Sequence, residues 1–303
     1  MAGLRKEYPN ENLDTLCGLF GKSRQAYYKN KKSLVSFALI RATLLEAISY
    51  YRSKAPNMGG VKLYHELRRI YGHELVGGRD AFMKFLRSEK LMLSPHKPRH
   101  TTNSHHPYHK YPNLIKDIQA EYPNHIWVSD ITYIWIEGGV CYLHLITDVY
   151  SHAVIGWILA PGLHAEYTAE ALKQAIILAN SENLCGTIHH SDRGVQYACH
   201  MYVGILMSHH IRISMTEISQ PTDNAMAERM NGILKTEWIY GRSLFRNEEE
   251  ARREIAKMID FYNNERPHMS IGMKKPMDVY SGETPGRNLW KKTKKGKLPD
   301  EDK

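Results

Sequence analysis

The feature that most constrains the fold is a series of β-strand patterns in the middle of the chain. Three consecutive segments are rich in Ile, Val, Tyr and Trp and are separated by short turns: 126–136, 140–149 and 153–160. They predict three antiparallel strands. Helical and short strand patterns then alternate over 166–182, 187–190, 198–209, 211–215 and 225–240. Such an order predicts an α/β fold with a mixed sheet flanked by helices.

The amino-terminal residues 1–56 have a helical pattern instead. A short helix, a Gly-containing turn over 18–21 and a second helix with Ser23 as its N-cap match the spacing of a helix-turn-helix. In that arrangement Arg24 lies near the start of a recognition helix, where we expect it to bind DNA. A plain helical hairpin fits the pattern equally well. Residues 33–52 predict a separate amphipathic helix.

Residues 57–93 contain a second pair of predicted helices around a glycine-containing turn, again like a helix-turn-helix. Their polar faces carry several basic side chains, among them Arg68 and Arg69. A solvated basic face would explain these side chains. We favour contact with DNA phosphates, because this part of the chain holds most of the surplus positive charge.

Two segments lack helical or strand periodicity. Residues 94–122 are rich in Pro and His and predict a linker, and residues 283–303 form a basic tail. Residues 123–282 between them form the predicted α/β region. The linker histidines, which lie between residues 96 and 109, have no Cys or carboxylate among them. We therefore favour a structural or electrostatic role for them over metal binding.

The distribution of charge points to a polyanionic partner. The net charge is +9, but residues 1–112 carry +12, residues 113–280 carry −6 and residues 281–303 carry +3. Basic ends favour nucleic acid. Hydrophobic content of 42% excludes general disorder, and the apolar runs are too short to span a membrane. Four scattered cysteines argue against a disulfide framework or a zinc knuckle and predict a cytoplasmic location.

Three carboxylates in the α/β region stand where the fold should bring them together. Asp130 lies within the first strand, on the face that also carries apolar side chains, where a charge needs a partner. Asp192 follows the fourth strand directly, at the end where α/β sheets usually bind ligands. Glu228 lies on the late helix, with 35 residues between it and Asp192. Its helix face also carries, at helical spacing, Asn224, Asn231 and Lys235.

The residues around these carboxylates are more specific than their spacing. Four motifs occur in order: WVSDITY at 127–133, HSDRGVQY at 190–197, DNAMAERMNGILKTE at 223–237 and YNNERPH at 262–268. Together they resemble the OrfB-type transposases of insertion sequences, which have a retroviral-integrase-like catalytic core. The resemblance covers about residues 15–282, with the core over 123–282. Two departures are Arg229, in place of a small polar residue, and a turn before Asp223 without the family's glycine.

The resemblance implies a ribonuclease-H-like core in which Asp130, Asp192 and Glu228 are the catalytic DDE triad. Three unrelated surface carboxylates would be the alternative. The triad is expected to bind two Mg²⁺ ions, with Mn²⁺ able to substitute, because oxygen-only ligand sets suit these metals. Lys235 corresponds to the family's basic residue seven positions after the glutamate. The residues expected to bind DNA are Arg24, Arg68, Arg69, Arg193, Asn224, Arg229, Asn231, Lys235, Asn263 and Arg266.

The expected function is that of a DNA transposase, which cleaves and joins strands at element ends and in target DNA. The expected partners are double-stranded DNA, further copies of the chain in a homo-oligomer, and the upstream-frame product of the element. We expect the protein in the cytoplasm, associated with the nucleoid and not with a membrane. Two other readings are a non-catalytic DNA-binding regulator and a ribonuclease that acts on RNA–DNA hybrids.

Overall fold

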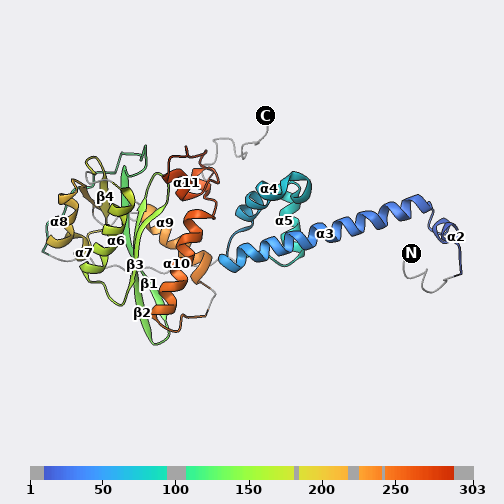
Figure 1. Ribbon diagram of the computed structural model, residues 1–303, viewed down its shortest axis with the longest axis horizontal. Helices are drawn as coiled ribbons and strands as arrows, with labels where there is room; N and C mark the ends of the chain where they lie inside the picture. The colour runs from blue at the N-terminus through green and yellow to red at the C-terminus, as the bar shows by residue number, and fades with distance from the viewer. Residues whose placement is uncertain (1–9, 94–106, 181–183, 218–224, 241–242, 290–303) are drawn as a thin grey trace.

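The computed structural model describes residues 10–93, 107–180, 184–217, 225–240 and 243–289. An α/β core lies at one end of the molecule, and an arm of helices extends from it (Figure 1). Asn224 and most of the predicted basic tail lie outside the described residues. In the part of the chain that the structure describes, no helix is both long and apolar enough to cross a membrane.

The core is built on a five-stranded mixed sheet. Its strands are β1 (Ile126–Ile136), β2 (Gly139–Asp148), β3 (Val154–Ala160), β4 (Ile188–Ser191) and β5 (Arg212–Met215), arranged in the order β3-β2-β1-β4-β5. The first three pair in antiparallel fashion, and β4 pairs in parallel with β1 and β5. This arrangement confirms the predicted strands and the predicted mixed, ribonuclease-H-like α/β fold.

Helices cover both faces of the sheet (Figure 1). One face packs against α6 (Ala165–Ala179), with α7 (Val195–Ala198) and α8 (His200–Ser208) beside it. The other packs against α9 (Ala225–Leu234), the π-helix η1 (Lys235–Ile239) and α10 (Glu248–Asn264), which the short helices η2 (Met269–Ile271) and α11 (Pro276–Tyr280) follow. The sequence predicted a helix over 198–209, and α8 follows most of this segment, whereas the extended Cys199 separates it from α7.

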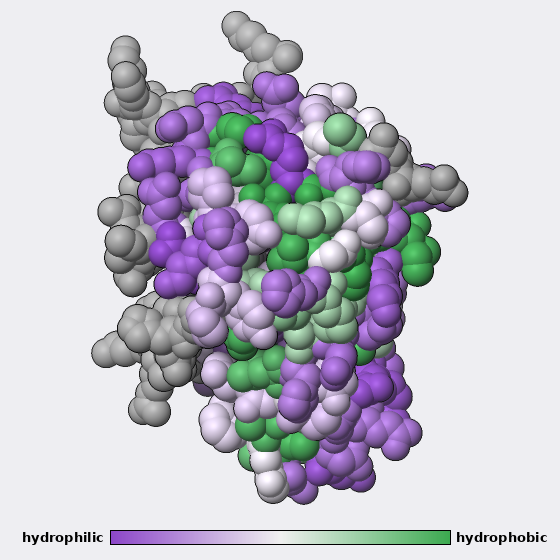
Figure 2. Space-filling model, turned by 90° about the vertical axis from the view of Figure 1, so that its left-hand side faces the viewer, coloured by the Kyte–Doolittle hydropathy of each residue, from purple (hydrophilic) through white to green (hydrophobic). Residues whose placement is uncertain are grey.

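The core end of the molecule mixes apolar and hydrophilic side chains on its surface (Figure 2). The helices α6 and α8 lie at this end in Figure 1 and expose several large apolar residues: Ile177, Met201 and Met207. The sheet beneath them is closely packed, because Gly156 on β3 lets the backbone of α6 approach. A Cβ atom on Gly156 would lie 2.1 Å from the carbonyl oxygen of Ala171.

The arm consists of α2 (Leu13–Gly18), α3 (Arg24–Lys54), α4 (Gly60–Val76) and α5 (Arg79–Ser88). Ser23 caps α3 as predicted, since its hydroxyl accepts a hydrogen bond from the backbone N–H of Ala26 at 3.2 Å. The predicted separation of a recognition helix from the helix over 33–52 is wrong, because α3 runs through both segments. Gly72 kinks α4 at a φ of 76°, inside one of the predicted glycine breaks.

The arm and the core share one hydrophobic cluster. It includes Leu63 and Leu67 of α4 together with Met230 of α9 and Phe261 of α10. The indole N–H of Trp238 also donates a hydrogen bond to the carbonyl oxygen of Lys54 at 2.6 Å. The part of the arm nearest the core is therefore packed on it, although the intervening residues 94–106 are not described.

We expect Gly156→Ala to destabilise the protein by about 1–3 kcal/mol, because the added methyl group forces α6 away from the sheet. Denaturant unfolding measures the effect. Gly204→Ala is the matched control, since a Cβ atom at Gly204 in α8 meets nothing within 4 Å. That variant should gain up to about 1 kcal/mol from its better helix propensity. Equal stabilities for the two variants would contradict the close packing.

Candidate active site

Asp130 lies on β1 and faces α9. Its Oδ2 accepts a hydrogen bond from the amide nitrogen of Asn231 at 2.6 Å, and its Oδ1 accepts one from the backbone N–H of Ile131 at 2.9 Å. Burial raises the pKa of Asp130 to about 7, and the negative charges of Asp192 and Glu228 add to this effect. The sequence predicted that Asp130 needs a partner, and the structure supplies the side-chain amide of Asn231.

Asp192 is held at the end of β4 by the turn that follows it. Its Oδ1 accepts a hydrogen bond from the backbone N–H of Gly194 at 2.9 Å. A Cβ atom on Gly194 would lie 2.9 Å from the same oxygen, so the glycine keeps the turn tight. Asp192 also helps to raise the pKa of Asp130 and that of the buried Tyr197, after burial itself. The negative charge of Asp192 therefore acts on both Asp130 and Tyr197.

Glu228 completes the group from α9. Its side chain is exposed, and its charge reaches Asp130, whose pKa it raises. The three predicted carboxylates are thus electrostatic neighbours supplied by β1, the end of β4 and α9. They are not a closed set of ligands: among the residues described, no group of three or more His, Cys, Asp or Glu side chains is arranged to hold a metal ion.

Two polar side chains of α9 and η1 lie beside the carboxylates. Asn231 is 6% exposed, and within the described structure its Oδ1 has no hydrogen-bond partner. Burial lowers the pKa of Lys235, whereas the negative charge of Asp130 raises it. The ammonium group of Lys235 therefore interacts electrostatically with that carboxylate. Carboxylate oxygens with a spare amide oxygen and no thiol are a donor set that fits a hard divalent cation.

Two residues expected to bind DNA are buried and hold the core together instead. The amide of Asn263 accepts a hydrogen bond from the backbone N–H of Val154 at 2.9 Å and donates one to its carbonyl oxygen at 2.8 Å. Arg266 is 1% exposed and forms an ion pair with Glu237. The prediction that these two residues contact DNA directly is therefore corrected, because their polar groups form hydrogen bonds and an ion pair inside the protein. Asn231 is buried too, against Asp130.

The other basic residues of that prediction lie at several places on the chain. Arg24 is exposed at the start of α3, 4.0 Å from Asp14. Arg68 donates a hydrogen bond to the hydroxyl of Tyr64, and Arg69 pairs with Glu66 at 3.1 Å. Near the carboxylates, Arg193 is half-buried and Arg229 is exposed. Of these five arginines, only Arg193 and Arg229 therefore lie near the candidate site, next in sequence to Asp192 and Glu228.

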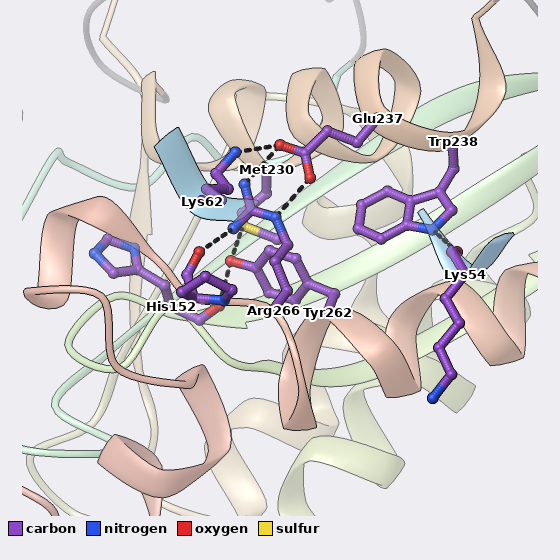
Figure 3. Close-up of polar contacts among 9 residues, drawn as sticks. Lys54, Lys62, His152, Met230, Glu237, Trp238, Tyr262 and Arg266 are labelled. Carbon is purple, nitrogen blue, oxygen red and sulfur yellow. Dashed lines mark hydrogen bonds and ion pairs between the residues drawn. The ribbon is translucent and has the colours of Figure 1, made fainter. Parts of the chain in front are cut away.

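A buried ion cluster near the site was missing from the sequence-based prediction. Glu237 receives both Nε and Nη2 of Arg266, at 2.7 and 2.8 Å, and also the ammonium group of Lys62 (Figure 3). Burial alone would raise the pKa of Glu237, but Arg266 and Lys62 outweigh it and hold that pKa at about 2. Glu237 and Arg266 belong to the motifs at 223–237 and 262–268. Nothing in the sequence indicated that Lys62 joins them.

The comparisons with known proteins agree with this architecture. Residues 120–221 and 209–276 match two models of the integrase core domain. The chain is 32% identical over 263 residues to the uncharacterized 31 kDa protein of insertion element IS600 of Shigella sonnei, which covers 85% of this chain and 94% of that protein. It is 29% identical over 236 residues to the transposase for insertion sequence element IS629 of Shigella sonnei, with coverages of 72% and 78%.

A solved structure of the HTLV-2 integrase catalytic core domain is also similar. It has a TM-score of 0.39 and 21% identity, and the alignment covers 52% of this chain and 97% of that chain.

We expect Asp130→Asn to stabilise the metal-free protein at pH 8 by on the order of 2–4 kcal/mol. The pKa of Asp130 is about 7 in the folded protein, against about 3.9 in an unfolded chain. Folding therefore takes up a proton between these pH values, and the ionised carboxylate lowers the stability above them. Thermal unfolding in EDTA between about pH 4 and pH 8 measures the growing difference from the wild type.

The matched control is Glu170→Gln, which removes an exposed carboxylate that pairs with Lys173 on α6. Its stability should follow that of the wild type at every pH. If Asp130→Asn did the same, the pKa of Asp130 would not be raised by its burial and its neighbouring carboxylates as described.

Proposed function

The chain belongs to the insertion-sequence transposases with an integrase core domain, and within this family we propose that Asp130, Asp192 and Glu228 form the centre that cleaves and joins DNA strands. The observation that carries the proposal is the position of Asp130, which is buried and held by Asn231 and a backbone N–H beside Asp192 and Glu228. Burial raises the pKa of Asp130 most, and the charges of Asp192 and Glu228 raise it further, even though these hydrogen bonds stabilise its ionised form. Such an arrangement costs stability and is typical of a functional site.

We further propose that the three carboxylates hold Mg²⁺, with Mn²⁺ as a substitute. When bound, two such cations activate the attacking oxygen and neutralise charge on the phosphoryl and leaving oxygens. The chain's own residues prepare the site for this role. Asn231 fixes Asp130, the N–H of Gly194 fixes Asp192, and the Oδ1 of Asn231, which has no partner among the described residues, would accept a hydrogen bond from a water at the site.

The DNA partner follows from family and charge together. The chain acts on DNA as a transposase, and we propose that the +12 segment over residues 1–112 grips the ends of the element. Lys235, beside Asp130, would neutralise a phosphate that enters the site. We also propose that copies of the chain assemble on DNA, that the upstream-frame product joins them, and that the protein works at the bacterial nucleoid.

We expect Asp130→Asn, Asp192→Asn and Glu228→Gln each to lower strand cleavage and joining at least about 100-fold in Mg²⁺, since each removes a proposed metal ligand. Binding of the same DNA should change little, because the basic segments are intact. Gel electrophoresis of labelled element ends measures cleavage, and a gel shift measures binding.

Glu170→Gln, on the opposite face of the sheet from α9, is the control and should cleave at the wild-type rate. A triad variant that also cleaved at that rate would disprove the site. A wild-type chain that bound ends but never cut them would favour the DNA-binding regulator, and cleavage of RNA–DNA hybrids alone would favour the ribonuclease.

A further inference from the structure

A pocket of about 530 Å³ lies where the arm meets the catalytic helix. Its walls come from the start of α4, the outer side of α9, η1 and residues 266–269. The volume is in the range of sites that bind small molecules or parts of larger ones. Glu228 is among the lining residues and Asp130 and Asp192 are not, so the pocket adjoins the proposed catalytic group at Glu228.

The pocket carries an excess of positive charge. Its charged lining residues are Lys62, Glu228, Arg229, Glu237 and Arg266. Glu237 binds both Lys62 and Arg266, so this buried trio, shown in Figure 3, keeps one positive charge that Glu237 does not neutralise. A buried net charge is costly unless a counter-ion approaches it. The pocket therefore favours an anion over a cation or a neutral ligand.

Lys62 is the basic group of the trio that is best placed to meet such an anion. Its ammonium group has three N–H donors, and the contact with Glu237 uses one of them. The side chain is 14% exposed, whereas that of Arg266 is 2% exposed. Burial lowers the pKa of Lys62, and the charge of Arg266 lowers it further, so an anion in the pocket would relieve both effects.

The remaining walls leave room for a tetrahedral oxyanion. Thr236 supplies an exposed hydroxyl on η1. Gly232 lies on the pocket side of α9, and a Cβ atom there would meet nothing within 4 Å, so the wall is open at this point. His268 closes the far side and is kept neutral, because burial and the neighbouring His152 and Arg266 lower its pKa.

We propose that this pocket binds a backbone phosphate of the DNA strand that passes Glu228, with Lys62 as the principal donor and Thr236 as a second. The inference rests on the proposed function, because it needs DNA at the carboxylates. The proposal makes the arm a part of the active site, because Lys62 of α4 binds a phosphate next to the one that is cleaved.

Binding of element-end duplexes in which single phosphates near the cleaved bond are replaced by neutral methylphosphonates tests the proposal, in EDTA so that nothing is cut. The wild type should lose about tenfold in affinity at one position, the loss typical of a charged hydrogen bond. Lys62→Met should bind the natural DNA about tenfold more weakly than the wild type does. Its affinity should not fall further when the methylphosphonate is placed at that position. Its salt dependence should fall by about 0.9 in log–log slope.

Lys62→Arg keeps the positive charge, so its affinity should again fall when the methylphosphonate is placed at that position. Lys173 is an exposed lysine on α6, and Lys173→Met should behave as the wild type. If Lys62→Met does not fold, as judged by circular dichroism, Thr236→Val replaces it and should weaken the response at the same phosphate. A folded variant with the wild-type response at every phosphate would overturn the subsite. Loss of all end binding by the wild type would instead contradict the proposed function.

Discussion

The buried carboxylate of Glu237 is the interaction on which the arrangement of the active site depends. It lies on η1, directly after α9, which carries the proposed catalytic residue Glu228, and it binds Arg266 just beyond α10 and Lys62 at the start of α4. Removing Glu237 would leave two buried cations without their partner, which costs about 3–5 kcal/mol. The backbone reinforces the same junction, because the carbonyl oxygen of Glu237 accepts a hydrogen bond from the N–H of Asn57 at 2.8 Å. The orientation of α9, and hence of Glu228, is tied to both the core and the arm.

The positions of the three carboxylates disfavour the ionised form of Asp130, because it is buried and lies near two other negative charges. The sheet order places β1 beside β4, so Asp130 in the middle of β1 lies near Asp192 just beyond the end of β4, and α9 brings Glu228 to them. Hydrogen bonds from Asn231 and Gly194 keep the first two in place despite their repulsion. The rigid cluster around Glu237 therefore supports a helix whose charged residue faces like charges.

The sequence predicted the parts of this structure that depend on local patterns. Segments rich in Ile, Val, Tyr and Trp located β1, β2 and β3, and the hydroxyl of Ser23 marked the start of α3. It failed at two helices: α3 continues from Arg24 to Lys54 without the predicted break, and the last turn of the 225–240 helix widens into a π-helix that buries Glu237. The three carboxylates were found through their flanking motifs, whereas Asn263 and Arg266 were assigned to DNA because their burial is not visible in a sequence.

Ion pairs across the junction change the meaning of the +12 charge of the first 112 residues. Part of that charge is used inside the protein: Lys62 pairs with Glu237, and Lys54 pairs with Glu265 at 2.5 Å. In return Lys275 of the core pairs with Glu66 of α4 at 2.8 Å. The acidic core thus attracts the basic arm before any DNA is bound, and the charge left for DNA is smaller than the sum suggests. Because the trio around Glu237 retains one positive charge, part of the remaining charge lies beside Glu228, where we propose that a phosphate binds.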